Sequence, residues 1–314
     1  MSTPTATVFG GSGFVGRYTV GELARRGYRV RVAVRRPDRA LFLRPMGDVG
    51  QVTPMAANIR DGASVAAAVE GADAVINLVG LLYEAGRQRF HAVHAEGAGR
   101  IAQAAAAAGV ERLVHVSAIG AAPDSPAAYA RSKAAGEDAV RGAFPAAVVV
   151  RPSIVFGIED DFLNRFAWIA RLAPAIPLIG GGNTRFQPVY VGDVASGVAR
   201  IAGDTGISGR AYEFGGPEVF SFRELMETML RHIGRRRLLL PVPGALAMLP
   251  AGLMELSPFP PMLTRDQIRM LASDNVASGD APGLADLGLD PTPLDAVAPG
   301  YLARYRRGGR AAGR

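Results

Sequence analysis

The sequence has no cysteine, only one lysine and only one tryptophan. Without cysteine the protein has no disulfide framework, no thiolate metal ligand, no cysteine-bound iron–sulfur cluster and no cysteine nucleophile. Histidine is scarce as well, with four residues in the chain. His91 and His94 are spaced to share one face of a helix, but no third ligand accompanies them in the sequence. We therefore expect no metal site.

Long apolar runs and targeting patterns are also missing. The longest uncharged apolar stretch, residues 238–254, is interrupted by prolines and glycines, and such a pattern does not predict a membrane span. Residues 1–7 show no charged segment followed by an apolar one. From this we expect neither a signal peptide nor a transit peptide.

The remaining composition is that of a folded protein with a basic surface. The 314 residues are 49% hydrophobic and 20% charged, which suits a buried core and about two domains. The net charge is +7, carried almost entirely by arginine. This balance suits an anionic lipid surface or an acidic partner subunit. No basic motif interleaved with aromatic residues occurs, so nucleic acid is not an expected partner.

Strand and helix patterns alternate through the first half of the chain. Short valine-rich runs predict strands at 5–9, 29–34, 51–55, 73–79, 112–117 and 147–150. Helical patterns lie between them, at 14–26, 61–70, 90–108 and 127–141. This order predicts an α/β protein with a doubly wound parallel (Rossmann) sheet and a smaller, irregular C-terminal region.

The same pattern predicts domain limits. We expect a dinucleotide-binding Rossmann domain over residues 1–156, with 186–203 returning to it. Residues 157–185 and 204–303 are expected to form a smaller substrate or docking region. Residues 304–314, which contain arginine and glycine but no acidic residue, are expected to form a basic flexible tail.

A glycine-rich loop follows the first predicted strand. Gly11, Gly13 and Gly16 have the spacing G-x-G-x-x-G. Alone, this spacing also fits an ordinary turn. Between a strand and a helix it predicts backbone N–H groups that approach a pyrophosphate at the helix N-terminus. The expected cofactor loop comprises Gly10, Gly11, Ser12, Gly13, Phe14, Val15 and Gly16.

The end of the second strand bears on the choice of cofactor. An acidic residue there would bind the ribose 2′-hydroxyl of NAD, whereas this chain has Arg35 and Arg36. Two guanidinium groups suit a 2′-phosphate, and Arg17 can approach the same group, so we expect NADPH, with NADP preferred over NAD. The alternative is that arginine is simply common in this chain. Further expected cofactor contacts, after the third and fourth strands, are Asn58, Asn77 and Val79.

Tyr129 and Lys133 lie four residues apart, on one face of a predicted helix. A nearby ammonium group favours the phenolate by Coulomb attraction, and it can also hold the nicotinamide ribose of the cofactor. The tyrosine would then act as a general acid or base. Ser117, at the end of the fifth strand, is the expected third catalytic residue. The alternative is a surface lysine beside a half-buried tyrosine, with a serine that only satisfies backbone groups.

These residues resemble the short-chain dehydrogenase/reductase superfamily in its extended and atypical branches. Within it, the chain is most similar to the reductase-like, NADPH-binding accessory subunit of respiratory complex I (NADH:ubiquinone oxidoreductase) and its bacterial relatives. The runs that carry the resemblance include VFGGSGFVG from Val8, NLVGLLYE from Asn77, VHVSAIGA from Val114, YARSKAAGE from Tyr129 and RPSIVFGIEDD from Arg151. More specific are FLNRFA from Phe162, GGGNTRFQPVYVGD from Gly180 and LTRDQ from Leu263.

The resemblance implies a tightly held NADPH and a mainly structural or assembly role beside the quinone-reducing arm of complex I. The chain also departs from active extended enzymes. Those enzymes usually place a catalytic hydroxyl where this chain has Ile119, and their substrate loop is longer than residues 121–128. Both departures count against turnover, and neither counts against cofactor binding.

Three functions are compatible with the sequence. The first is an NADPH-binding accessory protein docked on complex I, peripheral on the cytoplasmic face of a bacterial inner membrane. The second is a free NAD(P)-dependent reductase, epimerase or dehydratase with an unidentified small-molecule substrate. The third is a cofactor-gated regulatory protein. The Tyr129–Lys133 pair favours chemistry, whereas Ile119 and the specific C-terminal runs favour docking.

Residues 238–262 bear on the choice between docking and chemistry. They are rich in large apolar side chains and follow three arginines, Arg235 to Arg237. Such a segment suits an apolar docking surface next to a protein subunit or the bilayer interface. A buried substrate-domain core would have the same composition.

Overall fold

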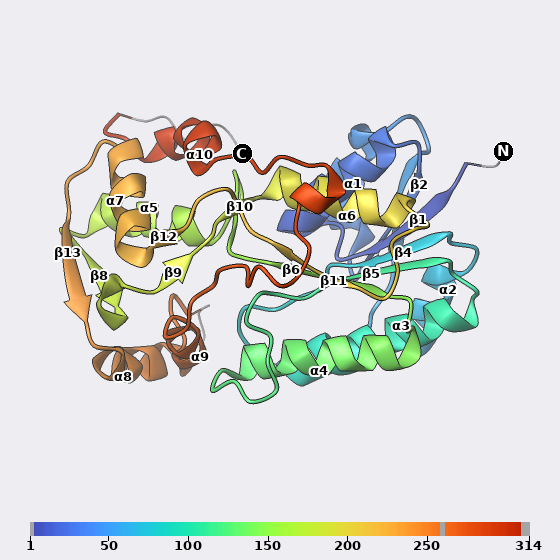
Figure 1. The fold of residues 1–314 in the computed structure, drawn as a ribbon, viewed down its shortest axis with the longest axis horizontal. Helices are drawn as coiled ribbons and strands as arrows, with labels where there is room; N and C mark the ends of the chain where they lie inside the picture. Colours follow the sequence, from blue (N-terminus) through green and yellow to red (C-terminus); the bar gives the residue numbers. More distant parts are fainter. Residues whose placement is uncertain (1–2, 258–260, 309–314) are drawn as a thin grey trace. The chain divides into compact units, whose positions relative to one another are not determined.

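The computed structural model describes residues 3–257 and 261–308, and the chain divides into two compact units (Figure 1). Unit 1 comprises Met1–Pro152, Val191–Phe214 and Gly279–Asp290. Unit 2 comprises Ser153–Tyr190, Gly215–Ser278 and Pro291–Arg314.

Unit 1 is built on a parallel sheet. In the described residues this sheet has seven strands in the order β11-β6-β5-β4-β1-β2-β3, and all neighbouring pairs are parallel. The strand order reverses between β1 and β4, which places the ligand crevice of a doubly wound sheet at their carboxyl ends. The predicted doubly wound α/β fold is confirmed. The strands are β1 (Thr5–Phe9), β2 (Arg29–Val34), β3 (Val52–Ala56), β4 (Ala74–Asn77), β5 (Arg112–Val116), β6 (Val148–Pro152) and β11 (Ala211–Phe214).

Helices cover both faces of this sheet (Figure 1). On one face α1 (Phe14–Arg25) packs against α6 (Val191–Gly203), and on the other α3 (Gly97–Ala107) packs between α2 (Gly62–Val69) and α4 (Ala128–Ala143). Strands buried on both sides need continuous apolar sequence, and β1 is buried along its whole length. The core on the α3 side contains Phe9, Val75, Ile101, Leu113 and Val140.

Unit 2 combines helices with short strand pairs. Its core lies around α5, α7 and α10 and includes Leu163, Phe222, Leu225 and Tyr301. The helices are α5 (Phe162–Leu172), α7 (Phe222–His232), α8 (Gly244–Glu255), α9 (Arg265–Met270) and α10 (Leu294–Leu302). Within the described residues the strand pairs are β7 (Val155–Phe156) with β10 (Val189–Tyr190), β9 (Arg185–Phe186) with β12 (Phe220–Ser221), and β8 (Ala175–Ile179) with β13 (Leu238–Val242).

The long helix predicted at 90–108 differs from the structure in its first turns. His91–Glu96 forms a π-helical segment, and α3 begins only at Gly97. Gly136 of α4 packs directly on the π-helical backbone: a Cβ at Gly136 would lie 2.1 Å from the carbonyl oxygen of His94. Alanine-rich sequence has no local signal for such a widened turn, because the contact comes from another helix.

Two sequence predictions fall partly outside the described residues. Of the tail predicted at 304–314, residues 309–314 lie outside them, whereas Arg304 donates a hydrogen bond to the carbonyl oxygen of Ile158 at 3.0 Å. Of the apolar segment 238–262, Phe259 lies outside them.

Candidate cofactor site

The glycine loop makes a tight turn between β1 and α1. Gly10 has a φ of +79°, and a Cβ built on it would lie 3.1 Å from the backbone of Leu78 and Val79. A Cβ on Gly16 would lie 2.3 Å from the carbonyl oxygen of Gly10. Glycine is required at both positions, and as a result α1 begins directly against the loop.

The N-terminus of α1 faces this loop. Gly13 is its N-cap residue, and none of the described side chains caps the helix there. The first backbone N–H groups of a helix have no partners within the helix and carry a partial positive charge. A cradle that a Cβ would fill, together with these N–H groups, fits the pyrophosphate of a dinucleotide.

A cavity of about 260 Å³ opens beside the loop, among the carboxyl ends of β1 to β4. Of the predicted cofactor residues, the cavity is lined by Gly10, Ser12, Gly13, Arg35, Asn58 and Val79. The predicted residues that do not line it are Gly11, Phe14, Val15, Gly16, Arg36, Asn77 and Lys133. The cavity is therefore lined by three of the seven loop residues and by the ends of the strands beside them.

Asn77 supports the cavity wall rather than lining it. Its Oδ1 accepts a hydrogen bond from the backbone N–H of Val79 at 3.1 Å, and its Nδ2 lies 3.1 Å from Nδ1 of His115. Because both ends of the amide are engaged within the protein, Asn77 fixes the position of Val79 at the cavity. His115, which sequence reasoning passed over, is thus part of the support.

The structure separates the two arginines after β2. Arg35 lines the cavity, whereas Arg36 lies 3.8 Å from the carboxylate of Asp38. Arg17 does not line the cavity; its guanidinium stacks over the ring of Phe42 at 5.2 Å. Of the three arginines that sequence reasoning connected with the 2′-phosphate, Arg35 is the one at the cavity.

A further arginine of the cavity wall, Arg60, was missed from the sequence. It lines the cavity together with Asn58, and its backbone N–H donates to Asn58 Oδ1 at 3.2 Å. Its position two residues after Asn58 was the signal in the sequence that could have assigned it to the cavity. Arg35 and Arg60 provide two cations at the end of the cavity near β2 and β3, where an adenosine phosphate would lie.

Tyr129, Lys133 and Ser117 come together at the carboxyl end of β5. The Nζ of Lys133 donates to the carbonyl oxygen of Val116 at 3.1 Å and lies 5.9 Å from the centre of the Tyr129 ring. A Cβ on Gly80 of the cavity wall would lie 3.5 Å from the same Nζ. Ser117 is 3% exposed, and its hydroxyl has no hydrogen-bond partner among the described residues. A buried hydroxyl without a partner fits a site that accepts a ligand group.

Burial determines the protonation of this pair. It lowers the pKa of Lys133 to about 8, partly opposed by the carboxylate of Glu137. It raises the pKa of Tyr129 to about 12. Burial of the phenol thus works against the phenolate that the Tyr129–Lys133 spacing predicts, and the role of the pair stays a prediction. At neutral pH the phenol of Tyr129 keeps its proton, which is the form that can donate a hydrogen bond.

Ile119 occupies the position where active extended enzymes place a hydroxyl. Its side chain is buried, and its backbone N–H donates to the carbonyl oxygen of Pro152 at 3.0 Å. This position therefore gives the site an apolar side chain and no side-chain donor.

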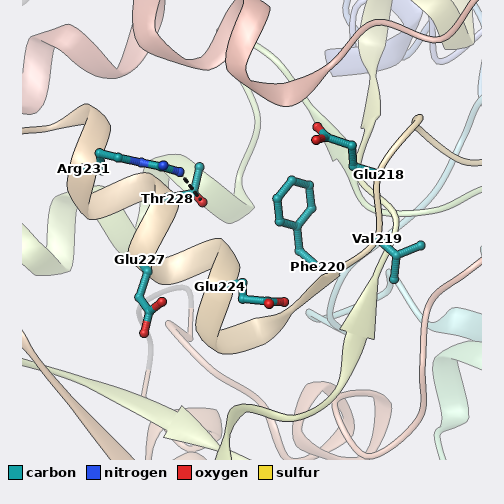
Figure 2. Close-up of a pocket in the computed structure, with 7 residues that line it drawn as sticks. All are labelled: Glu218, Val219, Phe220, Glu224, Glu227, Thr228 and Arg231. Atoms are coloured by element: carbon teal, nitrogen blue, oxygen red, sulfur yellow. Dashed lines mark hydrogen bonds between the residues drawn. The ribbon is translucent and has the colours of Figure 1, made fainter.

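A larger cavity, of about 490 Å³, lies in unit 2 beside α7 and β12 (Figure 2). Arg231 donates to the hydroxyl of Thr228 at 2.9 Å, and three carboxylates share the lining. One of them, Glu224, accepts the backbone N–H of Ser221 as part of the capping box of α7. The excess of carboxylates disfavours a pyrophosphate there, so size alone does not mark the cofactor site.

Comparison with known proteins agrees with the observed fold. Residues 6–215 match the model of the NAD dependent epimerase/dehydratase family. The crystal structure of triphenylmethane reductase from Citrobacter sp. complexed with NADP(H) superposes with a TM-score of 0.75, covering 95% of this chain and 99% of that one at 18% identity. The structural likeness shows the fold, and the family match supports a nicotinamide dinucleotide as the class of cofactor.

Complex I subunits of several organisms match almost the whole chain. The mitochondrial NADH dehydrogenase [ubiquinone] 1 alpha subcomplex subunit 9 of Arabidopsis thaliana is 41% identical over 98% of this chain and 80% of its own length. The mitochondrial NADH-ubiquinone oxidoreductase 40 kDa subunit of Neurospora crassa is 33% identical over 96% of this chain and 80% of its own length.

The predicted location in a bacterial cytoplasm is wrong. It rested on the pattern of the first residues, whereas the complex I relatives from plant, fungus, mouse and slime mould are all mitochondrial proteins. The pattern of the first residues is a weak guide to the compartment, because a targeting segment is not part of the fold that the relatives share.

Proposed function

The chain belongs to the NAD dependent epimerase/dehydratase family, and we propose that it is an NADPH-binding accessory subunit of respiratory complex I whose main role is structural. The proposal rests above all on an exposed apolar face of unit 2, in a chain that is similar over nearly its whole length to complex I subunits. In this proposal unit 1 binds NADPH and unit 2 docks on complex I. With such relatives, we place the protein in mitochondria.

The exposed face lies on α8 and β13. Leu246, Leu249 and Leu253 of α8 are 64%, 75% and 72% exposed, and their spacing puts them on one side of the helix. On the opposite side Ala247 and Ala251 are buried in a small cluster. Further exposed apolar side chains are Leu238, Leu240, Met254, Leu256 and Met262.

An apolar face of this kind suits an interface rather than a substrate-domain core. Exposed Arg236 precedes β13, so acidic protein groups or anionic lipid headgroups would complement this edge. None of the described helices has the length and hydropathy of a membrane span. We propose that the face contacts complex I subunits beside the quinone-reducing arm, at the level of the lipid headgroups.

Cofactor choice in the proposal depends on Arg35. Replacing Arg35 with alanine is expected to reduce the preference for NADPH over NADH by about tenfold or more, because a charge-assisted contact to the 2′-phosphate is worth about 1.5–3 kcal/mol. Arg36→Ala is the matched control, and it is expected to change the preference less than about threefold, since Arg36 faces Asp38. Fluorescence titration with both nucleotides measures the effect. Equal affinity of the unaltered protein for NADH and NADPH would contradict the proposed preference.

Turnover is expected to be slow or absent with carbonyl substrates. Ile119 offers no donor to a reacting oxygen, and the loss of one such donor costs about 100- to 1000-fold in rate. The measurement is loss of NADPH absorbance with a panel of aldehydes, ketones and quinones, with Tyr129→Phe as the control for reaction at this site. A turnover of about 10 per second on a defined metabolite, abolished in Tyr129→Phe, would contradict a mainly structural role.

The second candidate function is a free NAD(P)-dependent reductase, epimerase or dehydratase. It is favoured by the unpartnered hydroxyl of Ser117 next to the Lys133 contact on Val116. A protonated Tyr129 is suited to donate to a carbonyl oxygen in such an enzyme. The turnover experiment separates this candidate from the accessory subunit.

A further inference from the structure

We propose that His94 is a positioning residue, which ties the cofactor-cavity wall at Leu81 to the helix that carries Tyr129 and Lys133. The inference rests on the proposed cofactor binding by unit 1 and adds a residue that sequence reasoning considered only as a metal ligand. Two hydrogen bonds and the packing around one imidazole ring support it.

The hydrogen bonds of His94 determine its tautomer. Nε2 accepts the backbone N–H of Leu81 at 2.9 Å and therefore carries no proton. The proton of the neutral ring is then on Nδ1, which donates to the hydroxyl of Ser132 at 2.8 Å. Ser132 in turn donates to the carbonyl oxygen of Tyr129 at 2.7 Å. The chain of bonds runs from Leu81 through His94 and Ser132 to α4.

The surroundings keep this ring neutral and fixed in orientation. Burial and the charge of Lys133 lower the pKa of His94 to about 2, so the bridge does not switch in the physiological range. The ring stacks on Phe90 with centroids 5.5 Å apart and meets the ring of Tyr129 edge to face at 5.4 Å. Because the ring is packed on both sides, its orientation is fixed, and each nitrogen stays directed at its own hydrogen-bond partner.

The π-helical segment brings His94 to this position. It places the ring beside α4, and Gly136 lets the two backbones meet at the His94 carbonyl. π-helical turns are rare and frequently occur at functional sites. Gly80 lies close to both His94 and Lys133. A Cβ on Gly80 would lie 3.8 Å from Nε2 of His94 and 3.5 Å from Nζ of Lys133.

The bridge connects two parts of the proposed cofactor site. Leu78, Val79, Gly80 and Leu81 line the cavity, and α4 carries the Tyr–Lys pair. Residues 78–81 belong to no helix or strand, so the bond from Leu81 to His94 restrains a segment that regular secondary structure does not hold. We infer that His94 sets the distance between the cavity wall and Lys133, and thus the fit of a dinucleotide that contacts both.

The test compares three substitutions that remove different parts of the bridge. His94→Phe keeps the ring packing and loses both hydrogen bonds. His94→Asn keeps a donor near Nδ1 and loses the acceptor for Leu81. His94→Gln keeps an acceptor near Nε2. His91→Phe is the matched control, because His91 lies on the same π-helical segment but is exposed and contacts Glu96 instead.

The first measurement is hydrogen exchange of the Leu81 amide in ligand-free protein, and the second is NADPH affinity by fluorescence titration. We expect the Leu81 amide to exchange about tenfold faster, and NADPH affinity to fall about tenfold, in His94→Phe and in His94→Asn. The size of both effects is that of one or two neutral hydrogen bonds. We expect His94→Gln to recover most of both losses and His91→Phe to match the unaltered protein. Recovery by glutamine distinguishes positioning from packing, which phenylalanine preserves better.

Each contrary result has a distinct meaning. Unchanged affinity and unchanged exchange in a folded His94→Phe protein would overturn the positioning role alone. Equal losses in the glutamine and phenylalanine variants would also overturn it, because the acceptor would then be irrelevant. Absence of NADPH binding by the unaltered protein would instead overturn the proposed function, while the Leu81 exchange would still report on the bridge.

Discussion

Replacing Lys133 with methionine is expected to stabilise the ligand-free protein and at the same time to weaken its binding of NADPH. Lys133 is 5% exposed, and burial lowers the pKa of its ammonium group to about 8. Below that pH the folded protein holds a charge that has lost its hydration, at a cost on the order of a few kcal/mol. Methionine fills the same space without the charge.

The effect on stability depends on pH with a definite sign. In the unfolded chain a lysine keeps its proton up to its ordinary pKa of 10.5, whereas folded Lys133 releases it near pH 8. Between these values the unfolded state binds more protons, so this residue makes stability rise with pH across that window. The advantage of Lys133→Met should therefore be full below pH 8 and vanish towards pH 10.5.

The same substitution, Lys133→Met, is expected to lower the affinity for NADPH. Lys133 is proposed to donate to the nicotinamide ribose, and a charged donor contributes about 1.5–3 kcal/mol, or about 10- to 150-fold in affinity. Denaturant unfolding at several pH values and NADPH titration measure the two effects. Arg131→Met is the matched control on the same helix, because Arg131 is exposed. A variant with lower stability at pH 7 and unchanged affinity would return Lys133 to a structural role.

Replacing Leu246, Leu249 and Leu253 together with glutamine is expected to release the protein from complex I. Burial of a leucine contributes about 1.5–3 kcal/mol, so three exposed leucines that become buried on docking account for a loss of about 100-fold or more. Fold and NADPH binding should not change, because these side chains lie outside the cores. This triple variant is preferable to deletion of 238–262, which would take β13 away from β8.

The measurement is co-migration with NADH dehydrogenase activity on a native gel, after extraction in mild detergent. Val49→Gln is the control, since Val49 is an exposed apolar residue of unit 1. Continued co-migration of the folded triple variant would show that α8 is not the docking face. Recovery of the unaltered protein only in the soluble fraction at low salt, apart from that activity, would favour the free reductase.

The sequence by itself determined the features that depend on neighbours along the chain. The alternation of strands and helices, the glycine turn and the four-residue spacing of Tyr129 and Lys133 are all local. Local patterns predict them because a turn with positive φ or a buried strand limits the residue type wherever it occurs. The doubly wound fold then follows from the right-handed connection of parallel strands.

Only the tertiary structure decided which of several similar residues lies at the cavity or on the surface. Arg35 and Arg36 are adjacent in the sequence. Only the folded structure after β2 shows that Arg35 lines the cavity, whereas Arg36 lies near Asp38. The segment that contains α8 is apolar on all sides, so its exposed face was undefined until Ala247 and Ala251 were seen to be buried. The protonation of Tyr129 and the bridge by His94 depend on burial between distant segments, since hydration and hydrogen bonding are properties of the folded surroundings and not of sequence spacing.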